Sequence, residues 1–340
     1  MEAVYINKPE DVEIKGIDGP IAKEGEALLK VLYGGICGSD LGTYKGSNLY
    51  TDYPRIPGHE FSARIIKIGA NDSGLKEGMI VTCNPYFNCG TCYSCRRGYV
   101  NCCTGNQTMG AQRDGAFQEF LTMPIGRIYD VKGLPPKSAA LVEPFCIGHH
   151  AVKRAKVRPG ERVLVVGAGT IGLFAAISAK LAGAKVHICD VAQTKLDMVK
   201  PFGLDGTILN KDADSFSEQV SEITGGDGFD VCIEAVGIPS TYMNCINAAA
   251  HRGRVVIVGI GKQSLDFRYS VLQTKELDVF GSRNALKEDF LEAIDIFKDG
   301  KIDLESIVSG VYSFKDVGRA FKEFKINGAE KLKVLIKFPD

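Results

Sequence analysis

Short apolar runs alternate with turn residues along the first part of the chain. The runs at 27–33, 62–69 and 79–83 are rich in β-branched and other apolar side chains, and segments rich in glycine and cysteine separate them. No long helical period interrupts this pattern. Short runs between turns are typical of β-strands, so we predict an irregular, β-rich domain here.

A different pattern follows the proline-containing link at 133–144. Apolar strands now alternate with glycine turns and amphipathic helical segments. The strand-like runs lie at residues 162–166, 185–189, 229–235, 254–258 and 277–281. This alternation predicts a doubly wound parallel sheet of the Rossmann type. The fold class is therefore α/β plus β.

The C-terminal part predicts a helix at 288–300, a second segment at 311–324 and an apolar strand at 333–338 that packs back on the first domain. With 340 residues the chain fits two domains. We predict a catalytic domain at 1–145 and 285–340, and a dinucleotide-binding domain at 146–284.

Composition narrows the class of protein. Hydrophobic residues make up 45% and charged residues 24% of the chain, as in soluble folded proteins. Lys plus Arg and Asp plus Glu both number 41, so no bulk charge favours nucleic acid or a membrane surface as a partner. The N-terminus lacks the apolar run of a signal peptide, which predicts a cytoplasmic protein.

A glycine-rich turn follows the strand at 162–166. It contains Gly167, Gly169 and Gly172 in the sequence GAGTIG, with Thr170 and Ile171 between the last two glycines. Such glycines permit a tight turn and let backbone N–H groups approach a pyrophosphate at a helix N-terminus. The turn predicts a dinucleotide site, although a strand–helix turn that binds nothing can have the same sequence.

Asp190 ends the next predicted strand, where a carboxylate can bind the two ribose hydroxyls and repel a 2′-phosphate. This position favours NAD over NADP. The nearby Lys195 qualifies that preference, because a cation there could neutralise a phosphate.

Four cysteines, here called the cysteine lobe, have the spacing C-x2-C-x2-C-x7-C; they are Cys89, Cys92, Cys95 and Cys103. Four thiolates suit a closed tetrahedral zinc site that stabilises a loop. Cys102 could replace Cys103 as the fourth ligand. Disulfides and a nucleic-acid-binding zinc ribbon are the alternative interpretations.

Cys37, His59, Glu60 and Glu143 supply thiolate, imidazole and carboxylate groups from separate segments. Three protein ligands with an exchangeable water are what a catalytic zinc requires. Each residue alone has an ordinary structural explanation, but the set together with a dinucleotide motif predicts a metal-dependent dehydrogenase.

Over essentially its whole length the sequence resembles the zinc-containing medium-chain alcohol and polyol dehydrogenases. It is most similar to the sorbitol dehydrogenase and bacterial sugar-acid (galactonate or idonate type) branch. The matching stretches are GICGSD, PGHE, the cysteine lobe, LVEPF, GAGTIG with Asp190, and GSRN. The resemblance implies a GroES-like catalytic domain and two zinc ions per chain, one catalytic and one structural.

By this resemblance Cys37 and His59 ligate the catalytic zinc, with either Glu60 or Glu143 as a further carboxylate ligand. Ser39 would be the first hydroxyl of a proton relay, unless it only caps a helix. Gly42 replaces the relay histidine of some relatives, so the outer proton path must run through water or another residue, with Tyr44 and Lys45 as candidates. None of the histidines at 149, 150, 187 and 251 is assigned to zinc.

The resemblance also places Val236, Val258 and Arg283 in the nicotinamide pocket. Arg283 could meet a polar substrate or form only a surface salt bridge.

The predicted function is hydride transfer between a secondary alcohol, either a polyol or a sugar acid, and NAD. A threonine-type or sugar-phosphate dehydrogenase of the same family is the nearest alternative, and a non-enzymatic NAD-binding module is a further one. The resemblance suggests a homodimer or homotetramer, assembled through the sheet edge near 277–281.

Overall fold

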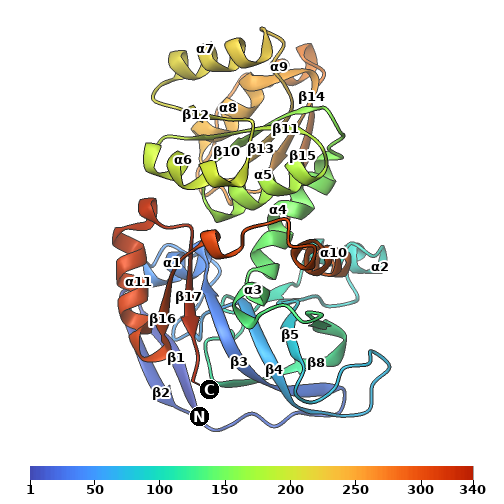
Figure 1. Ribbon diagram of the computed structural model, residues 1–340, viewed down its shortest axis with the longest axis vertical. Helices are drawn as coiled ribbons and strands as arrows, with labels where there is room; N and C mark the ends of the chain where they lie inside the picture. Colours follow the sequence, from blue (N-terminus) through green and yellow to red (C-terminus); the bar gives the residue numbers. More distant parts are fainter. Residues whose placement is uncertain (340) are drawn as a thin grey trace. The chain divides into compact units, whose positions relative to one another are not determined.

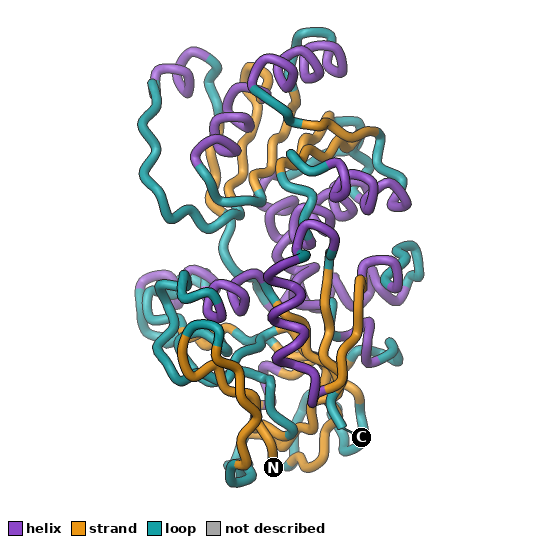
Figure 2. Tube along the Cα trace, turned by 90° about the vertical axis from the view of Figure 1, so that its left-hand side faces the viewer, coloured by secondary structure: helices purple, strands orange, loops and turns teal. Residues whose placement is uncertain are grey.

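The structure is a computed structural model that describes residues 1–339. The chain divides into two compact units. The first joins Met1–Glu143 to the segment that begins at Leu286, and the second is Pro144–Ala285. Figures 1 and 2 show the elements of both units in two views.

The first unit is rich in β-structure. Its strands are β1 (Glu2–Lys8), β2 (Asp11–Gly16), β3 (Glu26–Ile36), β4 (Glu60–Ile68), β5 (Ile80–Cys83), β6 (Tyr86–Phe87), β7 (Gln107–Thr108), β8 (Phe120–Pro124), β9 (Ile128–Asp130), β16 (Val308–Ser313) and β17 (Lys333–Lys337). Its helices are α1 (Gly38–Tyr44), α2 (Tyr93–Arg96), α3 (Pro136–Ala139), α10 (Lys287–Lys298) and α11 (Val317–Ile326).

The main sheet of this unit has seven strands in the order β16-β17-β3-β4-β5-β9, and β8 also pairs with β3. The C-terminal strand β17 runs antiparallel to β3, with Val334 opposite Ile36. The predicted return of the last strand to the first domain is thus confirmed. Helix α11 packs along β16 and β17 and against α1 (Figures 1 and 2).

The second unit contains a six-stranded sheet between helices. Its strands are β10 (Arg162–Val166), β11 (Lys185–Asp190), β12 (Gly206–Leu209), β13 (Phe229–Glu234), β14 (Ala249–Ile257) and β15 (Asp278–Gly281). Its helices are α4 (Val142–Ala155), whose first two residues belong to the first unit, α5 (Thr170–Leu181), α6 (Gln193–Val199), α7 (Ala213–Thr224), α8 (Pro239–Ala248) and α9 (Ser270–Thr274).

All neighbouring strands of this sheet are parallel, in the order β12-β11-β10-β13-β14-β15. Helices α5 and α6 cover one face, and α7 and α8 lie on the other (Figure 1). Right-handed crossovers require this arrangement, because the chain runs outward from β10 to β12 and then returns through β13. The predicted doubly wound sheet is confirmed.

The structure corrects the sequence-based elements in three places. The segment 133–144, expected to be a link, contains α3 and the first turn of α4. The short edge strand β12 carries too few apolar residues to stand out in the sequence. Residues 311–324 are divided between the end of β16 and most of α11.

No helix among the described residues combines the length and the apolar character needed to cross a membrane.

Candidate active site

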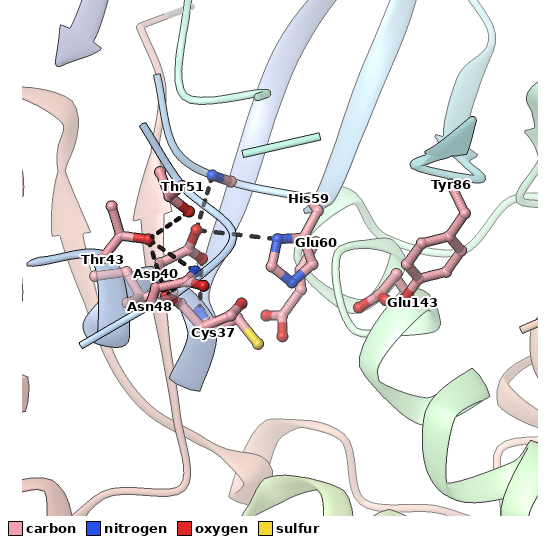
Figure 3. A network of polar contacts seen from close by, with 12 residues as sticks. Cys37, Asp40, Thr43, Asn48, Thr51, His59, Glu60, Tyr86 and Glu143 are labelled. Carbon is pink, nitrogen blue, oxygen red and sulfur yellow. Dashed lines mark hydrogen bonds and ion pairs between the residues drawn. The ribbon is translucent and has the colours of Figure 1, made fainter. Parts of the chain in front are cut away.

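Three of the predicted metal ligands meet where β3 and β4 lie side by side. Cys37 follows directly after β3 and precedes α1, while His59 and Glu60 stand at the start of β4. Since Gly35 lies opposite Glu60 in this antiparallel pair, the two ligand-bearing segments are brought together. The ligand atoms of Cys37, His59 and Glu60, here called the Cys37 cluster, lie within 4.8 Å of one another. Figure 3 shows all three side chains turned toward the same point.

Gly58 fixes the approach of the chain to His59. Its φ is +97°, and a Cβ atom there would lie 2.2 Å from the ring of the buried Phe117. A side chain at Gly58 would therefore either strain the backbone or displace Phe117. The glycine before the histidine thus has a packing role that sequence reasoning did not assign.

Asp40, which sequence reasoning missed, ties the Cys37 cluster together. Its Oδ2 accepts a hydrogen bond from the backbone N–H of Cys37 at 2.9 Å, and its Oδ1 accepts one from Gly58 at 3.0 Å. The same Oδ1 lies 3.9 Å from Nδ1 of His59, on the side of the ring away from Cys37 (Figure 3). A carboxylate three residues after a helix-starting residue is a recognisable signal for such a backbone contact.

The electrostatics of His59 follow from these neighbours. Burial alone would lower the pKa of His59, but Cys37, Asp40 and Glu143 outweigh burial and raise this pKa well above its usual value. Burial also raises the pKa of Asp40, against the opposing effect of His59. The site therefore concentrates acidic groups around one imidazole.

The two carboxylates have different partners. Glu60 is fully buried, and its two oxygens accept hydrogen bonds from Nζ of Lys333 at 2.7 and 2.6 Å. Glu143 is also buried, but it accepts a hydrogen bond from the hydroxyl of Tyr86 and stands outside the Cys37 cluster. Burial raises the pKa of Glu143 to about 7. Sequence reasoning found neither Lys333 nor Tyr86, since each is far along the chain from its carboxylate partner and only folding brings the two together.

The donor set of the Cys37 cluster fits zinc. A thiolate, an imidazole and a carboxylate are all zinc ligands, and three of them leave a fourth tetrahedral position for a substrate or water. Nδ1 of His59 is buried without a hydrogen-bond partner in the described chain, although Asp40 lies beside it. A carboxylate in that position orients an imidazole whose other nitrogen binds a metal.

The cysteine lobe forms a second cluster, in which the four sulfur atoms lie within 4.8 Å of one another. The backbone N–H of Cys89 donates to Sγ of Cys103 at 3.2 Å, and that of Cys92 donates to Sγ of Cys89 at 3.3 Å. Backbone donors lower the pKa of Cys92 to about 5, whereas burial raises the pKa of Cys103 to about 11. Cys102 is exposed and stands outside this cluster.

The glycine turn of the second unit joins β10 to α5. Gly167 has a φ of +108°, and a Cβ atom on Gly172 would lie 1.8 Å from the carbonyl oxygen of Gly167. Both positions therefore require glycine. Gly169 directly precedes α5, and Thr170 and Ile171, both half-buried, begin the helix. The turn leaves the N-terminus of a long helix where a phosphate can bind.

Asp190 ends β11 beside this turn. Its Oδ2 accepts a hydrogen bond from the backbone N–H of Ala168 at 2.8 Å, and its Oδ1 accepts one from Ala192 at 2.9 Å. Lys195 is half-buried in α6; burial lowers its pKa, and Asp190 acts in the opposite direction. Lys195, the cation that could neutralise a 2′-phosphate, therefore interacts electrostatically with Asp190.

The other predicted cofactor residues follow successive strands at the carboxyl edge of the same sheet. Val236 comes after β13, Val258 after β14 and Arg283 after β15, and Val236 and Arg283 are exposed. Ligands of open parallel sheets bind at this edge. Glu234, which the sequence analysis did not mention, accepts hydrogen bonds through Oε1 from the backbone N–H groups of Val236 and Gly237 at 2.9 and 2.8 Å.

Ser39 lies half-buried in the first turn of α1, with its carbonyl oxygen accepting from Thr43 Oγ1 at 3.2 Å and from Asn48 Nδ2 at 3.3 Å. Of the candidates for the outer proton path, Tyr44 packs in the core against Phe321, at 5.4 Å between ring centroids, which argues against this use. Lys45 is exposed.

Comparison with known proteins agrees with this geometry. Residues 23–133 match the alcohol dehydrogenase GroES-like domain, and residues 170–299 match the zinc-binding dehydrogenase domain. L-galactonate-5-dehydrogenase of Escherichia coli K12 is 36% identical over 99% of both chains. The chain belongs to the zinc-binding medium-chain dehydrogenases.

Other similar proteins support this membership. Sorbitol dehydrogenase of Halalkalibacterium halodurans is 31% identical over 93% of both chains. An alcohol dehydrogenase of Escherichia coli CFT073, solved with NADH, has a TM-score of 0.91 and 29% identity over 99% of both chains. The predicted family, fold and enzyme class are confirmed, with zinc and a nicotinamide dinucleotide as cofactors. A non-enzymatic binding module is set aside.

Proposed function

We propose that this dehydrogenase transfers a hydride between the secondary hydroxyl of a polyol or sugar acid and NAD. The observation that carries the proposal is the convergence of Cys37, His59 and Glu60 within 4.8 Å in the first unit, together with the Gly167 turn and Asp190 in the second. Relatives named for galactonate and sorbitol support the substrate class.

The two units take separate roles in this proposal. The first unit is the catalytic zinc domain, corresponding to the predicted 1–145 and 285–340. The second is the dinucleotide-binding domain, predicted at 146–284. The cysteine lobe would hold the structural zinc, because four thiolates leave no position for a substrate.

Cys37 and His59 would ligate the catalytic zinc, with Glu60 favoured over Glu143 as the carboxylate ligand, because only Glu60 belongs to the Cys37 cluster. When bound there, zinc supplies the Lewis acidity that lowers the pKa of an alcohol. Ser39, two residues after Cys37, would accept the alcohol proton and pass it toward solvent. Asp40 would hold the orientation of His59.

In the second unit, the N–H groups of the turn at 167–172 and the start of α5 would bind the pyrophosphate, with Gly167, Gly169, Thr170, Ile171 and Gly172 contributing. Asp190 would bind the ribose hydroxyls and disfavour a 2′-phosphate, in spite of Lys195. Val236, Val258 and Arg283 would line the nicotinamide pocket, and Arg283 could pair with the carboxylate of a sugar acid.

Assembly and location complete the proposal. Among the described residues β15 is an edge strand that pairs only with β14, and Val279 on it is 38% exposed. A homodimer or homotetramer could form through this edge; a monomeric mass in sedimentation would contradict it. None of the eleven cysteines forms a disulfide, as expected of a cytoplasmic protein.

The test combines metal analysis with a substrate panel. Zinc per chain is measured beside the reduction of NAD and NADP with polyols, aldonates, threonine and sugar phosphates, before and after chelation and zinc restoration. We expect about two zinc ions per chain, one for each cluster, and chelator-sensitive turnover of one polyol or aldonate class with NAD. A single zinc confined to the cysteine lobe, or turnover indifferent to chelation, would contradict the assignment of Cys37 and His59.

A further inference from the structure

Lys333 is a buried cation directly beside the Cys37 cluster. Its side chain is 3% exposed, and its Nζ lies 2.7 Å from Oε1 and 2.6 Å from Oε2 of Glu60. Nζ also donates a longer hydrogen bond, of 3.4 Å, to the carbonyl oxygen of Ile36. One ammonium group thus holds both oxygens of a carboxylate that also lies within 4.8 Å of the ligand atoms of Cys37 and His59.

Three neighbouring strands of the main sheet create this contact. Lys333 lies on β17, Glu60 on β4, and β3 runs between them. Gly35 of β3 is opposite both Leu335 and Glu60, and Lys333 is two residues from Leu335, on the same face of β17. A Cβ atom on Gly35 would lie 2.2 Å from Oε2 of Glu60. The missing side chain at Gly35 therefore lets the ion pair cross the middle strand.

The contact has a consequence for metal binding. A carboxylate that ligates zinc gives electron density to the ion, and a carboxylate held through both oxygens by an ammonium group is less available for that bond. Removal of either partner from a buried pair leaves an uncompensated charge, so Glu60 needs a cation in every state of the protein. Lys333 is the cation that holds both Glu60 oxygens in the structure, and a zinc ion in the Cys37 cluster would be a competing one.

We propose that Lys333 is a positioning residue that competes with the catalytic zinc for the Glu60 carboxylate, and so keeps Glu60 an exchangeable ligand. This inference rests on the proposed zinc site at Cys37 and His59. In the absence of zinc, Lys333 neutralises Glu60 and preserves the buried site. With zinc bound, Lys333 weakens the hold of Glu60 on the ion.

The test measures zinc affinity rather than turnover. The metal-free full-length protein is titrated with zinc against a competing chromophoric chelator. A parallel titration with cobalt shows which site fills at each equivalent, because a site with one thiolate and a site with four thiolates give different charge-transfer bands. The variants are Glu60→Gln, Lys333→Met and their combination. Lys337→Met, an exposed lysine on the same strand, is the control for net charge.

Competition predicts opposite effects of the two single substitutions. Glu60→Gln should weaken zinc binding at the Cys37 cluster at least tenfold (~10-fold per 1.4 kcal/mol). Lys333→Met should strengthen it by a similar factor, and Lys337→Met should leave it unchanged. The double variant should match Glu60→Gln, because Lys333 then has no carboxylate to hold. The cysteine lobe should bind zinc equally in all variants.

Other results overturn the inference. It fails if Lys333→Met binds zinc no more tightly than the unaltered protein. It also fails if Lys333→Met strengthens zinc binding by the same factor with and without the Glu60 carboxylate. Electrostatic repulsion between Lys333 and zinc would then explain the result without competition for Glu60. If the unaltered protein binds zinc only in the cysteine lobe, both the proposed function and this inference fail.

Lys333→Met could fail to fold without zinc, because Glu60 would be buried without a cation. Lys333→Arg then replaces it, since a guanidinium can hold both carboxylate oxygens in a planar, bidentate contact. We expect this variant to weaken zinc binding severalfold, and an unchanged affinity would overturn the inference.

Discussion

The two cysteine-containing clusters of the first unit are constructed in opposite ways. The cysteine lobe takes all its ligands from residues 89–103, and hydrogen bonds from nearby backbone N–H groups surround its sulfur atoms. The Cys37 cluster joins two separate segments through the pairing of β3 with β4, and it is lined by buried carboxylates. The first cluster is a local feature of the chain, and the second is a product of the folded sheet.

The number of ligands and the groups that hold them explain why one site is closed and the other open. Four thiolates satisfy a tetrahedral ion completely, so the lobe can only stabilise structure. The Cys37 cluster supplies three donors and depends on Asp40, Lys333 and Tyr86 to hold the donors and neighbouring carboxylates in place. Substitutions in the two clusters should therefore separate stability from turnover.

The largest effect on turnover should come from His59→Ala. Loss of the imidazole removes a ligand of the catalytic zinc, whose stabilisation of developing charge is worth several kcal/mol, so kcat/KM should fall roughly a thousandfold or more. Zinc per chain should fall by one, with the cysteine lobe still loaded. His251→Ala, at an exposed histidine of β14, is the control. Retention of both zinc ions in His59→Ala would remove this residue from the ligand set.

Cys103→Ser should act on the other cluster. We expect loss of the lobe zinc, faster proteolysis within 89–103 and a lower melting temperature, because this loop has little apolar core of its own. Cys102→Ser is the matched control, since Cys102 is adjacent in sequence but exposed and outside the cluster. Zinc loss from Cys102→Ser instead would show that the neighbouring thiol is the ligand.

Asp40→Asn should have an intermediate effect, confined to the Cys37 cluster. The amide keeps one acceptor oxygen but cannot accept from Cys37 and Gly58 with both oxygens, and it carries no charge beside His59. Loss of such an outer partner typically costs about 10- to 100-fold in metal affinity or activity. Asp212→Asn, which alters an exposed helix cap on α7, provides the control in zinc titrations. An unchanged affinity for the catalytic zinc would limit Asp40 to backbone packing.

The same contrast explains what the sequence could predict. Periodicity identified five of the six parallel strands, and it missed β12 because this strand is short and lies at an edge. The cysteine spacing predicted the group of Cys89, Cys92, Cys95 and Cys103, and the structure brings these four together with Cys102 outside the group. The glycine turn was equally local, because the φ of Gly167 and the close packing of Gly172 act within one strand–helix connection.

Residues that act through strand pairing could not be found in this way. Lys333 is far from Glu60 along the chain and reaches it only because Gly35 lacks a side chain. Tyr86 has no motif that links it to Glu143. Asp40 was the exception, since its position three residues after Cys37 in the sequence CGSD contained a usable signal.

Tyr86→Phe should have the smallest effect and the most informative one. The substitution deletes the hydroxyl that donates to Glu143 and leaves a buried carboxyl group without that partner, which should lower the free energy of unfolding by about 1–3 kcal/mol in urea denaturation. Turnover should change only severalfold, because Glu143 stands outside the Cys37 cluster. Tyr53→Phe removes the hydroxyl of a half-buried tyrosine that donates to the backbone carbonyl of Thr43, and it is the control for loss of a hydrogen-bonded phenol hydroxyl. If Tyr86→Phe instead reduced zinc affinity as strongly as Glu60→Gln, Glu143 would be the carboxylate that ligates the metal, and the two carboxylates would exchange roles.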